Sequence, residues 1–256
     1  MFEERLVECR GGLMKSVFFI PVFNQIEEFP KVLEELKSTD LPCDTILLVN
    51  NGSSDGSERF VHESGYDYID VEKNLGIGYS FMLAIDWALE RDYDVFGVLA
   101  SNGKMLPEEM NRVLDPIIND EADYTTGSRF LDGGEFPNLP LFRRIAIPMV
   151  NIFVCLFTGK MLTDCTCGYR AYKLDIMRRA EFDWHPEWMH TYGFEYYLYG
   201  KALIEKTVRC IEVPITMRYP PKGKRYSKMT PFKSWYHMVK PFVLARLNRK
   251  GFRPPP

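Results

Sequence analysis

Three short polar segments of this 256-residue chain carry groups that suit contact with a phosphate, and each follows an apolar run. They are 50–56 (Asn-Asn-Gly-Ser-Ser-Asp-Gly), 74–78 (Asn-Leu-Gly-Ile-Gly) and 100–104 (Ala-Ser-Asn-Gly-Lys). Glycines allow the backbone to approach a phosphate closely, and a lysine supplies positive charge. Each segment taken alone equally suits an ordinary polar turn. Their meaning therefore depends on the elements that carry them.

The apolar runs before these segments have the pattern of strands alternating with helices. Residues 16–20 form a β-type run that ends at Pro21, and 45–49 is apolar on both faces, as an inner parallel strand should be. Between them, 24–27 resembles a capping box, and apolar residues at helical spacing follow it up to Leu36. This order predicts a βαβ unit, and a parallel sheet binds ligands at the carboxyl ends of its strands.

The rest of the chain continues the alternation. Further strands are expected at 68–71, 94–99, 122–127 and 208–215, and further helices at 79–91, from Pro107 onward, at 141–158 and at 194–204. A chain of 256 residues with 46% hydrophobic residues can bury a sizeable core. We therefore expect an α/β fold, with a Rossmann-like, mostly parallel sheet flanked by helices.

Composition limits the function and the compartment. The net charge of -3 argues against general nucleic-acid binding, and six scattered cysteines suggest reduced thiols in the cytoplasm. The charged residues 1–10 lack a signal pattern. The apolar run 145–157 is interrupted by Pro148 and Asn151 and is shorter than the roughly 20 residues of a spanning helix. The helix predicted at 141–158 suits a core position or a membrane interface equally well.

Seven motifs occur in an order that matches one enzyme family. They are 20–24 (Ile-Pro-Val-Phe-Asn), 49–56 (Val-Asn-Asn-Gly-Ser-Ser-Asp-Gly), 74–76 (Asn-Leu-Gly), 127–130 (Gly-Ser-Arg-Phe), 164–170 (Asp-Cys-Thr-Cys-Gly-Tyr-Arg), 212–215 (Glu-Val-Pro-Ile) and 227–229 (Ser-Lys-Met). With these motifs, residues 15–230 resemble the family-2 glycosyltransferases of the glycosyltransferase-A fold. The resemblance is strongest to dolichol-phosphate and polyprenyl-phosphate mannosyl- and glucosyltransferases.

The resemblance implies a nucleotide diphosphate sugar as the donor. By similarity, Pro21, Asn24 and Glu27 border the nucleoside, Asn50 contacts the base, and Asp55 shapes the pocket. The other expected donor-binding residues are Asn74, Gly76, Ser101 and Asn102. Relatives usually carry Asp where this chain has Asn50, and an amide adds a donor while losing the charge. The base of the donor is therefore left open.

Segment 100–104 departs from the family at the metal site. Relatives carry an Asp-x-Asp-x-Gln type motif there, which coordinates Mg²⁺ or Mn²⁺ on the donor diphosphate. This chain has Ala100, Asn102 and Lys104 instead. A methyl group cannot ligate a cation, a lone amide is a poor ligand, and an ammonium repels one. We therefore expect no tight catalytic metal and no cofactor, with a weak dependence on Mg²⁺ or Mn²⁺ left open.

Lys104 is the predicted replacement for the metal. Its ammonium would neutralise the leaving diphosphate, supported by Arg129 and Arg170, since preorganised cations can stabilise such charge. Asp164 is expected to contact donor or acceptor; a helix cap or a partner for Arg170 are equal alternatives. The competing hypothesis for the whole chain is a catalytically inert, glycosyltransferase-like binding or scaffold subunit.

The expected acceptor is a polyprenyl-phosphate-type lipid. A phosphate with a second pKa of about 6 is already ionised near neutral pH and needs no general base, and its direct attack would invert the anomeric carbon. The expected acceptor- or phosphate-binding residues are Ser128, Arg218, Lys224, Arg225, Ser227 and Lys228, although a charge run can also be merely solvated. A soluble or glycan-linked acceptor is the alternative.

The chain is expected to divide into a catalytic domain, 1–230, and a basic amphipathic extension, 231–256. The mixture of aromatic, aliphatic and basic residues in 231–249 suits a helix that docks on an anionic bilayer, and equally one that packs on the domain. Together with the lipid acceptor, it predicts a peripheral protein at the cytoplasmic face of a membrane.

Overall fold

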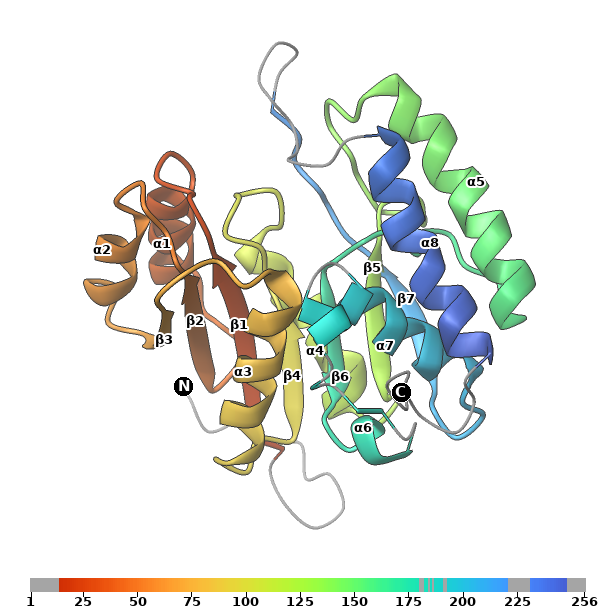
Figure 1. Ribbon diagram of the computed structural model, residues 1–256, viewed down its shortest axis with the longest axis horizontal. Coiled ribbons are helices and arrows are strands. Elements are labelled where there is room, and N and C mark those ends of the chain that lie inside the picture. Colours follow the sequence, from red (N-terminus) through yellow and green to blue (C-terminus); the bar gives the residue numbers. More distant parts are fainter. Residues whose placement is uncertain are drawn as a thin grey trace.

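The protein contains one seven-stranded sheet, as seen in a computed structural model that describes residues 14–179, 182, 183, 185, 187–190, 193–220 and 231–247. The strand order is β3-β2-β1-β4-β6-β5-β7 (Figure 1). The strands are β1 (Ser16–Val22), β2 (Thr45–Asn51), β3 (Asp67–Val71), β4 (Val95–Val98), β5 (Tyr124–Ser128), β6 (Arg170–Lys173) and β7 (Cys210–Pro214). Only β6 is antiparallel to its neighbours among these strands. The predicted mostly parallel α/β sheet is confirmed.

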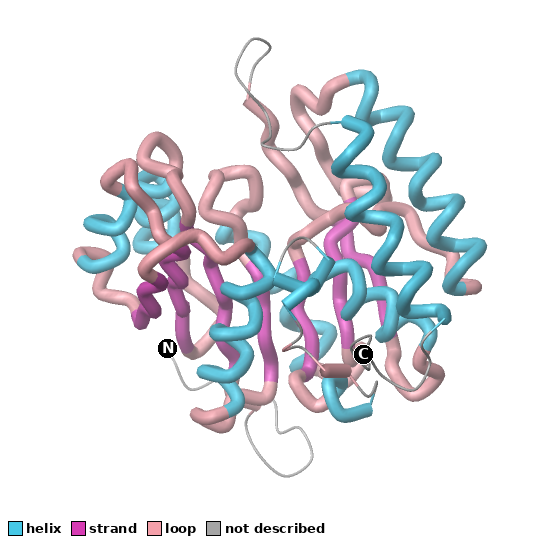
Figure 2. Tube along the Cα trace, viewed as in Figure 1, coloured by secondary structure: helices cyan, strands magenta, loops and turns pink. Residues whose placement is uncertain are grey.

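Helices cover both faces of this sheet (Figure 2). They are α1 (Phe29–Ser38), α2 (Ser57–His62), α3 (Ile77–Leu89), α4 (Met110–Ile118), α5 (Leu141–Thr158), α6 (Ile176–Arg179), α7 (Gly193–Ile204) and α8 (Pro231–Leu247), with short 3₁₀ turns at Pro107–Glu109 and Glu187–His190. Helices α1, α2 and α4 pack on one face, and α3, α5, α7 and α8 contribute to the core on the other. The result is a helix, sheet, helix sandwich.

Alternation along β1 explains why two cores form. Val17 and Phe19 face the core of α3 and α7, while Phe18 and Ile20 face the core of α1 and α4, and all four are fully buried. An inner parallel strand is covered on both faces and therefore reads as a continuous apolar run. The sheet is thus fixed between two apolar layers.

The connection from β1 to α1 differs from the sequence prediction. Strand β1 continues through Pro21, which pairs with Val49 of β2 beyond the last residue paired with β4; proline is tolerated where a strand has a neighbour on one side only. The expected capping box is wrong, because α1 begins at Phe29 without a side-chain cap. The Asn24 side chain instead accepts a hydrogen bond from the Ser54 amide, 2.8 Å away.

The C-terminal helix α8 packs on the body of the protein. Phe242 and Ala245 are buried against α7, where a Cβ on Gly200 would lie 3.0 Å from the Ala245 Cβ. Figure 1 shows α8 lying beside α5 along the same side of the molecule. For this part of the extension, packing on the domain is therefore the arrangement that the structure adopts.

The contact between Gly97 and Phe18 provides a test of the sheet's packing. A Cβ at Gly97 would lie 2.5 Å from the Phe18 ring, so Gly97→Ala should lower the free energy of unfolding by about 1–3 kcal/mol through overpacking. Urea denaturation measures this change, with Lys37→Ala on the exposed side of α1 as the control. An unchanged urea midpoint for Gly97→Ala would contradict the predicted overpacking at this contact.

Candidate active site

The polar segments gather at the carboxyl edge of the sheet, as predicted. The hydroxyl of Ser101, after β4, donates to the carbonyl of Pro21 at 2.6 Å. The amide of Asn24, after β1, donates to the hydroxyl of Ser53 at 3.2 Å. Hydrogen bonds therefore join the end of β1 and the segment after it to the segments that follow β2 and β4. The resulting surface includes the donor-binding residues expected on each of them.

The loop at 74–76 closes against the segment that follows β2. The Asn51 side chain donates to the Gly76 carbonyl at 2.8 Å and accepts from the Leu75 amide at 3.0 Å. Gly52 has φ +68°, and a Cβ there would lie 2.4 Å from the Lys73 backbone, so only glycine fits. The sequence interpretation missed Asn51 as this link, because the partners lie more than 20 residues away.

Asn50, the predicted base-contacting residue, is buried at the end of β2. Its amide donates to Asp70 Oδ1 at 2.8 Å, and its carbonyl oxygen accepts from the Ser53 amide at 3.1 Å. The other oxygen of Asp70 lies 2.7 Å from His62 Nε2. Asp70 on β3 thus supplies a carboxylate beside the amide at this position, which no sequence motif indicated.

Asp55 fixes the start of α2 and the loop before α1. Burial would raise the pKa of its carboxyl, but hydrogen bonds from Ser57 and from the Ile26 amide hold it below its usual value. These bonds measure 2.5 Å from the Ser57 hydroxyl and 3.0 Å from each of the Ser57 and Ile26 amides. Glu27, next in sequence to Ile26, is exposed. Asp55 therefore stabilises the conformation of the loop before α1.

A buried ion pair links the residue after β5 to the loop at 163–166. Arg129 and Asp164 meet through two bonds of 2.6 and 2.7 Å, with side chains only 3% and 0% exposed. The Arg129 guanidinium also donates to Tyr219 and to the hydroxyl of Thr166. Burial alone would lower the pKa of Arg129, but the Asp164 carboxylate reverses the effect and raises it. Asp164 is thus the partner of Arg129 rather than of Arg170.

Glu212 of β7 supports this ion pair by binding the backbone at Asp164. Its carboxylate accepts from the amides of Thr163 and Asp164 at 2.7 and 2.8 Å. The Ser128 hydroxyl, fully buried, lies 2.6 Å from that of Thr163. The prediction that Ser128 binds a phosphate is therefore corrected: its hydroxyl is used inside the protein, where it holds the 163–164 loop against β5.

Arg170 also departs from its predicted role. Its side chain is fully buried, and its guanidinium donates to the carbonyls of Cys167, Cys165 and Glu195. It stacks on Tyr199 with 4.5 Å between the guanidinium carbon and the ring centroid. Arg170 is the first residue of β6, and its side chain points to the face of the sheet that α7 covers, where the Glu195 carbonyl and the Tyr199 ring lie. Arg170 therefore stabilises the fold and does not reach a diphosphate.

Lys104 lies half-buried beside two arginines. Burial, Arg143 and Arg129 together lower the pKa of its amine from the usual 10.5 to about 8. The Lys104 ammonium also lies 5.6 Å from the centroid of the Tyr219 ring. Arg143, in the first turn of α5, was not predicted as a site residue, since nothing in the sequence connects it with a segment 39 positions earlier. Arg129 donates to Tyr219, over whose ring the Lys104 ammonium lies, so these groups share one edge of the sheet. We call Lys104, Arg143 and Arg129 the positive centre; Asp164 balances the charge of Arg129.

The remaining predicted cations lie elsewhere or outside the described residues. The guanidinium of Arg218 pairs with Glu35 of α1 at 2.7 Å, so in this conformation it bridges two surface elements. The Arg218 amide, however, donates to the Lys104 carbonyl at 2.8 Å and fixes that residue's backbone. The other predicted phosphate-binding residues, Lys224, Arg225, Ser227 and Lys228, fall in the undescribed range 221–230.

The donor set at 100–104 does not fit a hard divalent cation. Ala100 has no ligand atom, and the Asn102 side-chain oxygen accepts a hydrogen bond from the Lys104 amide at 3.2 Å. Lys104 adds a positive charge where a cation would need anions. Within the described ranges, no three His, Cys, Asp or Glu side chains gather in a metal-binding arrangement.

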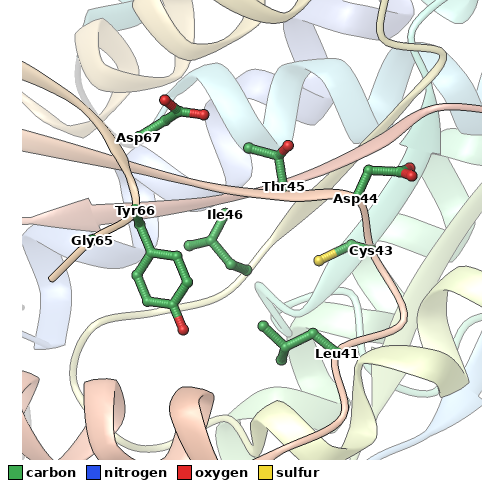
Figure 3. A pocket seen from close by; sticks show the side chains of 8 residues that line it. All are labelled: Leu41, Cys43, Asp44, Thr45, Ile46, Gly65, Tyr66 and Asp67. Atoms are coloured by element: carbon green, nitrogen blue, oxygen red, sulfur yellow. The ribbon is translucent and has the colours of Figure 1, made fainter.

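A separate hollow of about 250 Å³ lies at the opposite edge of the sheet, where β2 and β3 begin (Figure 3). It is lined by Leu41, Cys43, Asp44, Thr45, Ile46, Gly65, Tyr66 and Asp67. Asp44 is occupied by bonds of 2.7 and 2.9 Å from the amide and hydroxyl of Ser16. Burial raises the pKa of the Cys43 thiol to about 12, so it is not a reactive thiolate. The residues that line this hollow include no lysine or arginine, so it lacks the positive charge of the candidate site.

Several solved structures share this fold. Glucosyl-3-phosphoglycerate synthase from Mycobacterium tuberculosis, in complex with UDP, superimposes with a TM-score of 0.62 at 15% identity, covering 93% of this chain and 80% of the synthase. The same synthase in complex with Mn²⁺, UDP and glucosyl-3-phosphoglycerate also has a TM-score of 0.62, at 14% identity, covering 92% of this chain and 80% of that one. The fold is therefore the glycosyltransferase-A type that the sequence predicted.

The family follows from sequence. The profile of Glycosyl transferase family 2 matches residues 17–180. Undecaprenyl-phosphate mannosyltransferase of Micrococcus luteus is 31% identical over 79% of this chain and 83% of that enzyme. Polyprenol monophosphomannose synthase of Mycolicibacterium smegmatis is 29% identical over 79% and 77%. The chain belongs to glycosyl transferase family 2 and is a glycosyltransferase, which confirms the predicted family.

Removal of Asp164 tests whether the ion pair holds the site together. Asp164→Ala should lower the free energy of unfolding by about 3–5 kcal/mol, because Arg129 would stay buried without its counter-charge. Denaturant unfolding measures the loss. The matched control is Glu63→Ala, which removes an exposed partner 3.9 Å from Arg59 and should change little. Equally small effects in both variants would contradict a structural role for the pair.

Proposed function

We propose that the protein transfers a hexose from a nucleotide diphosphate sugar to a polyprenyl phosphate at a membrane surface, with inversion at the anomeric carbon. The observation that carries this proposal is the positive centre of Lys104, Arg129 and Arg143 beside the donor-binding segments. The names of the relatives, an undecaprenyl-phosphate mannosyltransferase and a polyprenol monophosphomannose synthase, support the same donor and acceptor classes.

The reaction would proceed by direct displacement. An oxygen of the acceptor phosphate forms a bond to the anomeric carbon while the bond from that carbon to the diphosphate breaks, and the diphosphate leaves with the electron pair. Because the acceptor is already an anion near neutral pH, no carboxylate has to remove a proton. This matches a site whose buried acid, Asp164, is committed to Arg129.

Lys104 would stabilise the departing diphosphate. Its ammonium belongs to the segment in which relatives bind a metal, and its low pKa reflects a half-buried position near two other cations. A preorganised cation in such a place stabilises the charge that develops as the bond breaks. Arg129, held by Asp164, adds positive potential, and Arg143 at the start of α5 would meet the acceptor phosphate.

Little or no metal dependence forms part of the proposal. Solved structures of the synthase include complexes with UDP and either Mn²⁺ or Mg²⁺. The residues at 100, 102 and 104 of this chain lack the anionic oxygens for such an ion, which supports a cation from the chain itself. A place at the cytoplasmic face of a membrane, and a catalytic domain at 1–230 followed by an extension at 231–256, complete the proposal.

A chelator experiment tests the metal-free part. Transfer to polyprenyl phosphate is measured with GDP-mannose, UDP-glucose and UDP-N-acetylglucosamine, with excess EDTA or with Mg²⁺. The expected result is transfer from one donor at a rate that EDTA leaves unchanged, because Lys104 neutralises the diphosphate. Strict dependence on Mg²⁺ would contradict that part. If no donor supports transfer and no nucleotide raises the melting temperature, the inert binding subunit is favoured instead.

The pH dependence tests the charge on Lys104. With a pKa of about 8, the free amine gains population above that pH, so kcat/KM should fall as the pH rises through 8. Lys104→Arg should move this fall to higher pH, because a guanidinium stays charged. Lys104→Ala should lower kcat by about 10²–10³, as loss of one charge-stabilising group does. Lys37→Ala, on exposed α1, serves as the control.

If kcat/KM of Lys104→Arg still falls at the same pH as that of the unchanged protein, another group is responsible for the titration. An unaffected kcat in Lys104→Ala would remove the proposed role in leaving-group departure.

A further inference from the structure

Helix α5 exposes an apolar row along its outer side. The row consists of Leu141, Phe142, Ile145, Met149, Ile152 and Leu156, each 53–79% exposed. Residues 145, 149, 152 and 156 follow the spacing of one helix face. These six make up most of the large hydrophobic side chains that the described residues leave exposed, and an apolar patch of this kind marks an interaction surface.

The other side of α5 is built into the fold. Ala146, Ile147, Val150 and Val154 are buried against the rest of the protein. The helix, with 18 residues and a mean hydropathy of 1.6, is long and apolar enough to cross a membrane by length and composition alone. Its inner face is already occupied by the protein core, so α5 suits a position on a bilayer rather than across it.

Charges at the two ends of α5 indicate what covers the row. The helix contains no Asp or Glu, carries Arg143 and Arg144 in its first turn, and is followed by the exposed Lys160. Apolar side chains flanked by basic residues match a surface of acyl chains and anionic headgroups. A second copy of the chain on this face would bring arginines and lysines together without acidic residues of the helix to meet them.

Helix α5 is also joined directly to the candidate active site. Asn151, 5% exposed, donates to the Thr163 carbonyl and accepts from the Cys165 amide at 2.9 Å. These two residues flank Asp164, the partner of Arg129. At its first turn, α5 carries Arg143, whose charge acts on Lys104. One helix therefore connects the apolar row with both charged parts of the site.

We propose that the outer face of α5 is the docking surface for an anionic lipid bilayer, and that docking brings the positive centre to a phosphate at that surface. This inference rests on the proposed function for the identity of the phosphate, but the docking itself does not. The row enters the headgroup region, the basic residues meet anionic lipids, and Asn151 keeps the 163–165 loop in place on the docked helix.

Vesicle binding by the full chain tests the proposal. The protein is sedimented with phosphatidylcholine vesicles that contain or lack phosphatidylglycerol. The expected result is binding to the anionic vesicles that weakens as salt is added, because salt screens the basic residues. The variant Met149→Ser/Ile152→Ser/Leu156→Ser should lose this binding. Tyr68→Ser/Leu89→Ser, which removes exposed apolar side chains elsewhere, should bind like the unchanged protein.

The same variants separate docking from catalysis. Loss of the row should lower transfer to a long-chain polyprenyl phosphate in vesicles, while transfer to a short, water-soluble polyprenyl phosphate stays unchanged. The melting temperature should also stay unchanged, since the substituted side chains are exposed. If no acceptor is glycosylated but binding to anionic vesicles still depends on the row, the proposed function fails and the docking surface stands.

Two results would overturn the docking surface. One is no binding of the unchanged protein to either kind of vesicle, in which case a dimer in solution that the row variant abolishes would assign the row to a second copy of the chain. The other is equal vesicle binding by the row variant and the unchanged protein. Should the triple variant fail to fold, Ile152→Ser alone and the salt dependence of the unchanged protein give the same decision.

Discussion

The buried ion pair between Arg129 and Asp164 is the constraint on which the arrangement of the site depends. Two charges removed from water are tolerated only with close pairing and further hydrogen bonds, and this pair has both. It ties the end of β5 to the 163–166 loop, which Glu212 and Asn151 hold from β7 and α5. Since Arg129 also donates to Tyr219, the segment after β7 is fixed beside Lys104. The cations of the site are thus held by the fold before any ligand arrives.

In the proposed function, this preorganisation allows a chain without acidic residues at 100, 102 and 104 to bind the diphosphate of the donor. A lysine that is half-buried among arginines has a lowered pKa, which means that its charged form is disfavoured in the free protein. An anion bound beside the ammonium offsets this cost of charging Lys104, because the two opposite charges attract each other. The same electrostatic arrangement that weakens protonation of Lys104 in the free protein therefore favours binding of a negatively charged group.

The sequence predicted the features that depend on local pattern, and missed those that depend on contacts far apart in the chain. The apolar runs at 16–20 and 45–49 indicated the inner strands, and the family motifs indicated the edge where ligands bind. Asn24 was read as a helix cap because its partner Ser54 lies 30 residues away. The short strand β6 is not predicted from the sequence, and Arg170 is expected beside the diphosphate, but its side chain points to the sheet face that α7 covers. Arg143 and Asn151 acquire their roles only through the packing of α5.

Proton uptake on binding a nucleoside diphosphate tests the central claim, that the Lys104 ammonium faces the diphosphate, most directly. Calorimetry at pH 8 in EDTA, in buffers of different ionisation enthalpy, measures the protons taken up per ligand bound. In the protein without ligand, the Lys104 side chain should be about half protonated at pH 8. The bound anion raises the pKa of Lys104, so up to about half a proton should be taken up per ligand. Lys104→Arg, which is already fully charged, should bind without this uptake. The same uptake by both proteins would contradict the claim.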